Sequence, residues 1–123
     1  MMKQMPNEAN HKLKLLFLCS QNKRRSLTAE RTLAHESELD VRSAGTENNA
    51  RVKVTGGMIG WADIIFTMEK KHTQRIRQRY QTELSGKKVI CLYIPDNYEF
   101  MDKQLVDIIR SKVNEHINRN YSE

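Results

Sequence analysis

The organisation of this chain follows from one stretch of sequence, Leu15-Leu16-Phe17-Leu18-Cys19-Ser20-Gln21-Asn22-Lys23-Arg24-Arg25-Ser26. It opens with an apolar run, the pattern of a strand that is buried on both faces. The run ends at a cysteine, and mostly polar residues follow. From Ser26 onward, apolar residues recur at helical spacing, which predicts that a helix begins near this serine. We therefore expect Cys19 at the carboxyl end of a buried strand, on a loop that leads directly into a helix.

This loop has the chemistry of an anion site that carries a reactive thiol. Unpaired backbone N–H groups and the helix dipole converge there. Together with Lys23, Arg24 and Arg25 they favour the thiolate form of Cys19, which is the competent nucleophile. Arg25 can offer two oxygens of a phosphate a planar fork of donors that a lysine cannot match.

Two further residues of the loop suit this chemistry. Ser26 can donate a hydroxyl hydrogen bond toward the sulfur, and Asn22 tolerates the left-handed backbone that a tight anion-binding loop often needs. The competing interpretation makes Cys19 a small core residue that merely ends a strand.

These residues resemble the signature of the low-molecular-weight protein tyrosine phosphatases, which is a cysteine, five residues, an arginine and a serine, followed shortly by an Ala-Glu pair. The resemblance extends downstream to Ser43-Ala44-Gly45-Thr46 and to Ala62–Met68 with His72. Two positions depart from the family pattern. Gln21 stands where the family usually has glycine, and Arg24 stands where many members carry a second cysteine. The segment between Gly45 and Ala62 is also shorter than in typical members.

The resemblance implies a cysteine-dependent phosphomonoester hydrolase that works through a phosphocysteine intermediate and needs neither a metal nor another cofactor. Family members place a general acid, an aspartate in an Asp-Pro pair, on the loop after the fourth strand. Here the order is inverted, Ile94-Pro95-Asp96-Asn97-Tyr98. Asp96 is the expected acid, with Glu99 and Asp102 as alternatives, and Tyr98 is expected to flank an aromatic substrate ring.

The resemblance and the loop chemistry together define a candidate site. Its catalytic members are Cys19, Arg25 and Asp96. Its substrate-binding members are Ser20, Gln21, Asn22, Lys23, Arg24, Ser26 and Tyr98. Two residues are assigned supporting roles: Ser43 either steadies Asn22 or is an ordinary turn serine, and His72 either hydrogen-bonds near the loop or lies on a helix surface.

Strand and helix patterns alternate along the chain, which predicts an α/β fold. At 123 residues the chain forms one domain, with a mobile tail at residues 1–12 and the phosphatase-like domain at residues 13–123. The arrangement is a doubly wound, four-stranded parallel sheet with helices on both faces. After the first strand and helix, the expected strands are Glu38–Ser43, Ala62–Met68 and Lys87–Ile94, and the expected later helices are Glu69–Tyr80 and a long one capped by Asp102.

Other parts of the sequence are less informative. Between Glu47 and Gly60 we expect at most one short helix, around Ala50–Met58, with Trp61 packed on the sheet edge. Cys91 is expected in the core. The basic stripe of Lys71, Arg75 and Arg79 on one helix face could receive a phosphorylated protein or RNA, although most such stripes are solvated surfaces.

Composition sets the expected partners and compartment. The formal net charge of +6 favours acidic partners, and we expect a phosphorylated protein or a small phosphomonoester, with nucleic acid as a less favoured partner. No apolar run is long enough to cross a bilayer, so no membrane partner is expected. The absence of a secretory pattern and the two widely separated cysteines favour a cytoplasmic location.

Two other functions are compatible with the same scaffold. One is an arsenate reductase, but that chemistry usually recruits extra cysteines close by, and here the second cysteine is Cys91. The other is a non-enzymatic module that grips phosphate or RNA, which the inverted acid loop and Gln21 keep open.

Overall fold

A computed structural model of the chain describes residues 12–121, with side chains described up to residue 117. All but the last residue of the tail expected at 1–12 lies outside this range. In chain order the elements are β1 (Leu13–Cys19), α2 (Arg25–Leu33), β2 (Leu39–Gly45), α3 (Gly56–Trp61), β3 (Ile64–Thr67), α4 (Lys70–Arg79), α5 (Gln81–Leu84), β4 (Lys88–Cys91) and α6 (Lys103–Tyr121).

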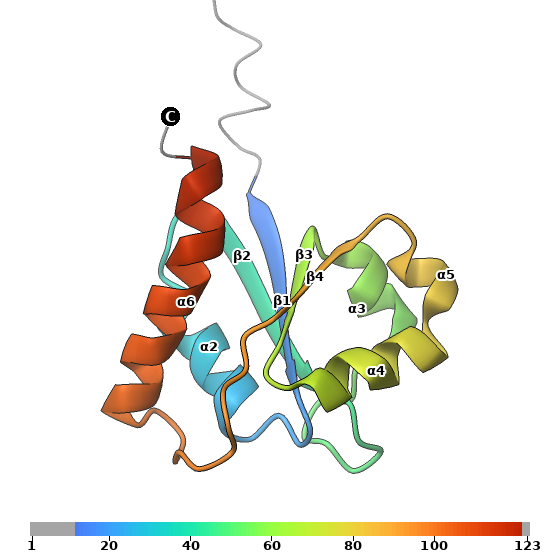
Figure 1. Cartoon of the computed structure of the whole chain (residues 1–123), viewed down its shortest axis with the longest axis horizontal. Coiled ribbons are helices and arrows are strands. Elements are labelled where there is room, and N and C mark those ends of the chain that lie inside the picture. Colours follow the sequence, from blue (N-terminus) through green and yellow to red (C-terminus); the bar gives the residue numbers. More distant parts are fainter. Residues whose placement is uncertain (1–11, 122–123) are drawn as a thin grey trace, which may run out of the picture.

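The four strands form one parallel sheet in the order β2-β1-β3-β4. This confirms the α/β class and the four-stranded parallel sheet expected from the sequence. Because all strands run the same way, the loops that follow them gather at one end of the sheet, the lower end in Figure 1. Ligands of open α/β sheets bind at this carboxyl end.

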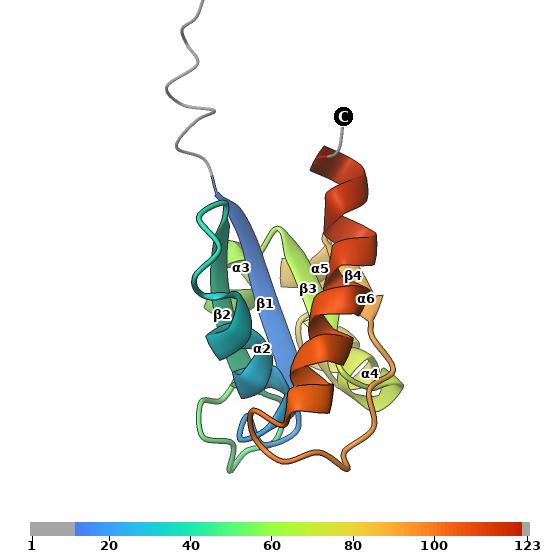
Figure 2. The same cartoon turned by 90° about the vertical axis from the view of Figure 1, so that its left-hand side faces the viewer.

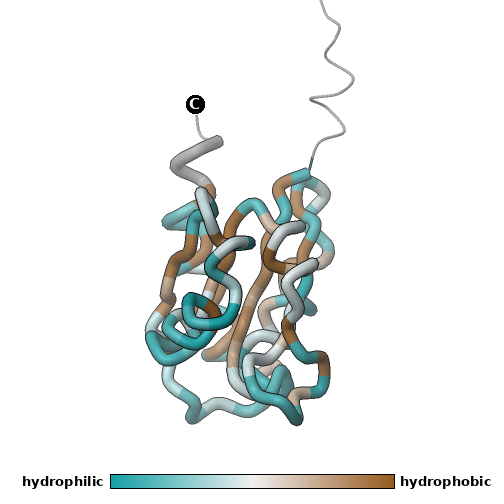
Figure 3. The backbone as a smooth tube through the Cα atoms, turned by 90° about the vertical axis from the view of Figure 1, so that its right-hand side faces the viewer, coloured by the Kyte–Doolittle hydropathy of each residue, from teal (hydrophilic) through white to brown (hydrophobic). Residues whose placement is uncertain are grey.

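Helices cover both faces of the sheet. The helices α2 and α6 lie over one face (Figure 2), and α3, α4 and α5 lie over the other (Figure 1). The central strand β1 supplies both cores, because Leu15 and Phe17 face α2 and α6, whereas Leu16 and Leu18 face the other layer. All four side chains are fully buried, and each contributes about 2 kcal/mol through burial of apolar surface. Figure 3 shows the corresponding hydrophobic strands between more polar helices.

The third and fourth strands are shorter than expected. The predicted strand Ala62–Met68 is reduced to Ile64–Thr67, because Ala62 serves as the C-cap of α3. The predicted strand Lys87–Ile94 ends at Cys91, because Tyr93 adopts a positive φ of 55° that interrupts the extended backbone. Cys91 is half-buried rather than in the core, as it lies on an edge strand.

The expected helix at Ala50–Met58 is displaced toward the carboxyl end, to α3. Thr55 sets its start, since its hydroxyl accepts a hydrogen bond from the Met58 amide at 3.2 Å. Trp61 ends the helix, and the guanidinium carbon of Arg42, on the edge strand β2, lies 4.1 Å from its ring centroid. The tryptophan therefore packs at the sheet edge, as predicted.

The helix α6 matches its sequence pattern. Leu105, Ile109, Val113 and Ile117 are all buried against the sheet, and the Asp102 carboxylate caps the helix by accepting from the Gln104 amide at 2.8 Å. Within residues 12–121, no helix is both long and apolar enough to span a bilayer.

Gly45, the last residue of β2, lies directly against the loop that follows β1. A Cβ atom at this position would lie 2.5 Å from the Ala50 Cβ and 2.5 Å from the Ser20 carbonyl oxygen.

We predict that Gly45→Ala lowers the free energy of unfolding by at least about 2 kcal/mol, because backbone must move to admit the methyl group. Urea denaturation measures this change. The control is Gly60→Ala in α3, where no atom lies within 4 Å and stability should be unchanged or raised by about 1 kcal/mol. Equal effects of the two substitutions would contradict the close approach.

Candidate active site

The loop between β1 and α2 lines a cavity of about 240 Å³ at the carboxyl end of the sheet. The residues that line it are Cys19, Ser20, Gln21, Lys23, Arg24, Arg25 and Asp96. Six come from the loop and its flanks, and Asp96 comes from the segment after β4. The structure therefore brings together the three residues predicted as catalytic.

The loop backbone is turned so that its amides face away from the neighbouring segment. The carbonyls of Cys19, Ser20 and Gln21 accept hydrogen bonds from the amides of Thr46, Glu47 and Arg51 at 2.9 to 3.1 Å. A trans peptide directs each carbonyl and the following N–H to opposite sides. The N–H groups of residues 20–22 consequently point to the other side of the loop, where an anion can accept from them.

The sulfur of Cys19 is held by a serine. Its Sγ atom lies 3.0 Å from Ser26 Oγ, in the first turn of α2. The cysteine is only 3% exposed, yet it lines the cavity beside Arg25. A hydroxyl at this distance can donate to a thiolate and stabilise its charge.

Asn22 fixes the shape of the loop. It is fully buried with φ of 60°, in the left-handed region. Its Nδ2 donates to Ser26 Oγ at 2.7 Å and to Ser43 Oγ at 2.9 Å, so the hydrogen bond expected between Ser43 and Asn22 is present. Arg51 donates to the Asn22 carbonyl and side-chain oxygens at 3.1 and 2.9 Å, a contact that sequence analysis missed.

Arg25 is almost completely buried, at 2% exposure. One of its nitrogens, Nη1, donates to the Ile94 carbonyl at 2.7 Å and also to the Glu69 carboxylate. Nε lies 3.7 Å from Asp96 Oδ1. Anchoring Nη1 in this way leaves the Nε and Nη2 edge, the usual fork for a phosphate, directed to the side of Asp96.

Glu69 is a second residue that sequence analysis missed. It is the N-cap of α4 and forms a capping box with His72. Partial burial acts to raise the pKa of Glu69, but the hydrogen bond and charge of Arg25, helped by Lys71 and His72, outweigh it and leave that pKa below its ordinary value. Glu69 therefore stays ionised beside the buried guanidinium at neutral pH.

His72 links the same helix to the loop. Its Nδ1 accepts from the Glu69 amide at 3.0 Å, so its Nε2 carries the proton and donates to Ser20 Oγ at 2.9 Å. The side chain is 1% exposed, and the alternative of a helix-surface histidine is wrong. Burial, together with the charge of Arg25, lowers the pKa of His72 to about 4.

The remaining predicted site residues have looser positions. Lys23 and Arg24 are exposed at the cavity rim, and Arg24 lies 4.0 Å from Glu99, which is itself 82% exposed. Asp102 caps α6 and does not line the cavity. Tyr98 is half-buried and packs against the core formed with α6, so the structure does not bring it to the cavity.

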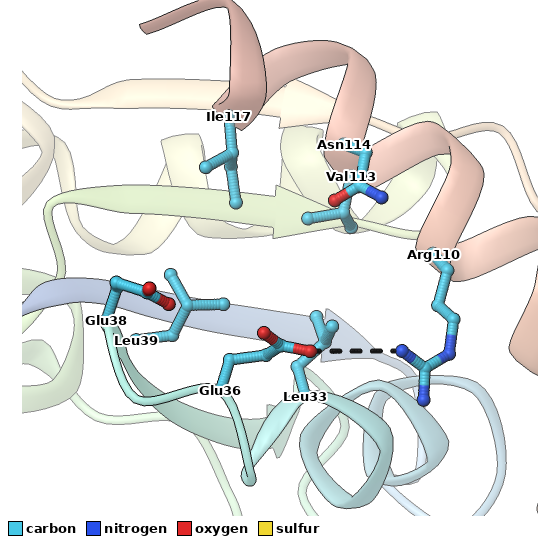
Figure 4. Close-up of a pocket in the computed structure, with 8 residues that line it drawn as sticks. All are labelled: Leu33, Glu36, Glu38, Leu39, Arg110, Val113, Asn114 and Ile117. Atoms are coloured by element: carbon cyan, nitrogen blue, oxygen red, sulfur yellow. Dashed lines mark ion pairs between the residues drawn. The ribbon is translucent and has the colours of Figure 1, made fainter. Parts of the chain in front are cut away.

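A larger cavity, of about 500 Å³, lies elsewhere (Figure 4). It is enclosed by α6 and the turn from α2 to β2, and Arg110 and Glu36 face each other across it at 3.9 Å. Leu39 lies at the amino end of β2, opposite Leu13, whereas Cys19 lies opposite Gly45. Six residues of strand separate the two levels, which is about 20 Å. This cavity is therefore distant from the thiol.

No group of three or more histidine, cysteine or acidic side chains within residues 12–121 is arranged to hold a metal ion. The buried polar groups of the site instead satisfy one another, or point to a space suited to an anion.

Comparison with solved structures agrees with this picture of the fold. A low-molecular-weight protein tyrosine phosphatase from Streptococcus pyogenes aligns with a TM-score of 0.71 and 15% identity over 87% of this chain and 92% of that one. A protein tyrosine phosphatase from Entamoeba histolytica aligns with a TM-score of 0.70 and 20% identity, over 90% of this chain and 98% of that one. An arginine phosphatase from Geobacillus stearothermophilus aligns with a TM-score of 0.69 and 18% identity, over 88% of this chain and 94% of that one.

The chain has the fold of these phosphatases. At identities of 15 to 20% the likeness concerns the fold alone. No protein-family model matches the sequence, and no curated protein matches it.

The ion pair of Arg25 with Glu69 yields a test of the site's architecture. We predict that Glu69→Gln lowers the free energy of unfolding by about 1–3 kcal/mol, because the buried guanidinium loses its ionised partner. The control is Asp107→Asn, which removes the exposed pair with Lys103 on α6 and should cost less than about 1 kcal/mol. Chemical denaturation at pH 7 measures both, and equal losses would contradict the importance of the buried pair.

The buried histidine predicts a pH dependence of stability. The unfolded chain takes up a proton on His72 near pH 6.5, whereas the folded protein resists this until about pH 4. Between these values the unfolded state binds more protons than the folded state. The free energy of unfolding is therefore unaffected by His72 above pH 6.5 and falls by about 3 kcal/mol as the pH is lowered to 4. Glu69, whose pKa is also lowered, acts in the same direction at the acid end.

The variant His72→Asn keeps an acceptor for the Glu69 amide and cannot titrate. Its unfolding free energy should therefore fall less between pH 7.5 and pH 4.5 than that of the wild-type protein. His35→Asn, at an exposed histidine, should retain the wild-type slope. A His72→Asn protein with the full wild-type slope would refute the assignment.

Proposed function

We propose that this protein hydrolyses phosphomonoesters through a covalent phosphocysteine on Cys19. The proposal is supported above all by one observation, that Cys19, the guanidinium of Arg25 and the carboxylate of Asp96 line the same cavity. A nucleophile, an oxyanion partner and a proton donor then surround one small space. The shared fold with protein tyrosine phosphatases supports the same assignment.

In the first step the Cys19 thiolate attacks the phosphorus in line with the leaving oxygen. The S–P bond forms as the P–O bond breaks, and the electron pair of that bond goes to the leaving oxygen, which takes a proton from Asp96. The loop amides and the Nε and Nη2 edge of Arg25 hold the equatorial phosphoryl oxygens.

In the second step a water molecule attacks the phosphocysteine. Asp96, now a carboxylate, accepts the proton of the water. The S–P bond breaks and the sulfur leaves as a thiolate, which the Ser26 hydroxyl, 3.0 Å away, stabilises by hydrogen bonding. Inorganic phosphate then departs, and the enzyme returns to its starting state.

The substrate class that we favour is phosphotyrosine in proteins or a small aryl phosphomonoester. The net charge of +6 and the exposed Lys23 and Arg24 at the rim favour a substrate that is acidic overall. A free reactive thiol requires a reducing compartment, so we propose a cytoplasmic activity.

We predict that the wild-type protein turns over para-nitrophenyl phosphate with inhibition by vanadate, and that Cys19→Ser abolishes turnover. Asp96→Asn should lower kcat by about 10²–10³, because general acid catalysis contributes gains of this size, and should remove the limb of the pH profile that reports the acid. Single-turnover kinetics across pH measures both effects. Full activity in Cys19→Ser would refute the proposal.

The same proteins distinguish the alternatives. A module that only binds phosphate or RNA would show no turnover, and a salt-sensitive association with RNA that persists in Cys19→Ser. An arsenate reductase would consume a thiol reductant in the presence of arsenate and require Cys91.

A further inference from the structure

A second hollow adjoins the proposed active site on the far side of Asp96. It has a volume of about 370 Å³ and is lined by Glu69, Lys70, Tyr93, Ile94, Pro95 and Asp96. Asp96 lines this hollow and the cavity of Cys19 alike. The two spaces therefore meet at the residue that we propose as the general acid.

Tyr93 occupies an unfavourable position in this hollow. Its φ of 55° lies in the left-handed region, which is an outlier for a bulky side chain. Its side chain is 68% exposed, although the residues on both sides, Leu92 and Ile94, are buried. The exposed ring therefore gains little stability from burial, and the positive φ is costly for a tyrosine.

The backbone turn at Tyr93 allows hydrogen bonds that stabilise the fold, but none of these bonds involves the tyrosine ring. The turn lets the amides of Leu92 and Ile94 donate to the carbonyls of Thr67 and Met68, both at 2.8 Å, and it directs the Ile94 carbonyl to Arg25. A glycine would make the same turn at lower cost. An aromatic ring held in solvent against these costs points to a role in binding.

The position of the acid determines where a leaving group must lie. A general acid has to reach the leaving oxygen, within about 3 Å, while the phosphorus stays in the loop beside Cys19. Asp96 borders both spaces, so a leaving group whose oxygen meets Asp96 has the hollow with Tyr93 and Pro95 next to it. Tyr98, packed into the core, is not available for this contact.

We propose that Tyr93, with Pro95, forms the leaving-group subsite and binds the aryl ring of an aryl phosphate. This inference rests on the proposed phosphatase function and deepens it, because it identifies the residue that selects aryl over alkyl esters. Aromatic stacking of this kind is worth about 3- to 10-fold in affinity.

The test compares binding of phenyl phosphate and methyl phosphate, by calorimetry, to the full-length Cys19→Ser protein. Binding is measured instead of turnover because the two leaving groups differ in intrinsic reactivity. In this parent protein, phenyl phosphate should bind about 3- to 10-fold more tightly than methyl phosphate. Adding Tyr93→Ala should bring the ratio of the affinity for phenyl phosphate to that for methyl phosphate close to 1. Adding Tyr93→Phe should preserve this ratio.

Phe100→Ala is the matched control. Phe100 is an aromatic residue of the same loop, 42% exposed, that lines neither the cavity of Cys19 nor the hollow. Its removal should leave the ratio unchanged.

A further variant separates binding from folding. Tyr93→Gly suits the backbone conformation, so its Tm should stay within a few degrees of the parent while the phenyl-to-methyl ratio falls to about 1. A large loss of Tm with an unchanged ratio would show that the ring is structural and would overturn the inference.

The two proposals fail in different ways. If wild-type protein hydrolyses para-nitrophenyl phosphate and the ratio is unaffected by Tyr93→Ala, the subsite is wrong and the phosphatase stands. If the parent binds neither phenyl phosphate nor inorganic phosphate and the wild-type protein shows no turnover, both proposals are wrong.

Discussion

The buried guanidinium of Arg25 is the constraint on which the site depends. A charge that is 2% exposed costs several kcal/mol to desolvate unless it is paired and hydrogen-bonded. Its partners come from two other elements, Glu69 at the start of α4 and the Ile94 carbonyl after β4. Through these contacts, Arg25 links the beginnings of α2 and α4 to the loop that carries Asp96. The carboxyl end of the sheet is assembled around this one side chain, and an anion would complete its coordination.

A second network shapes the loop independently of Arg25. The left-handed conformation of Asn22 is stabilised by Ser26 and Ser43, which accept from its side-chain nitrogen, and by Arg51, which donates to its side-chain oxygen. Amides of the segment after β2 donate hydrogen bonds to the loop carbonyls. Gly45 allows that segment to approach the loop closely. Although this segment is short, it supplies a hydrogen-bond donor for each of the three loop carbonyls. The loop amides are consequently presented by a rigid frame and do not depend on a ligand for their orientation.

The sequence was most informative where a pattern is local. The apolar run Leu15–Leu18 predicted the central strand, and the four-residue spacing from Leu105 to Ile117 predicted α6, because buried faces repeat with the period of the element. The contacts of Glu69 and Arg51 could not be predicted in this way, since they join residues 44 and 29 positions apart in the chain. His72 illustrates the same limit: its helix periodicity is that of a surface residue, and only the packing of α4 against Ser20 buries it. The pairing of Ser43 with Asn22 was accessible because parallel strands bring their carboxyl ends together.

The two carboxylates near Arg25 differ in a way that suits different tasks. Glu69 is half-buried, contacts Nη1 directly and has a pKa held below its ordinary value by that arginine, so it stays charged and fixed. Asp96 is 58% exposed and lies 3.7 Å from Nε, a distance at which no hydrogen bond forms. A phosphate that takes the Nε edge can displace Asp96 at little cost, since exposed ion pairs contribute at most about 1 kcal/mol. Asp96 lines both the cavity and the hollow, and the proposed mechanism places the leaving oxygen at this boundary. One carboxylate thus orients the arginine, and in the proposed reaction the other is free to move with the substrate.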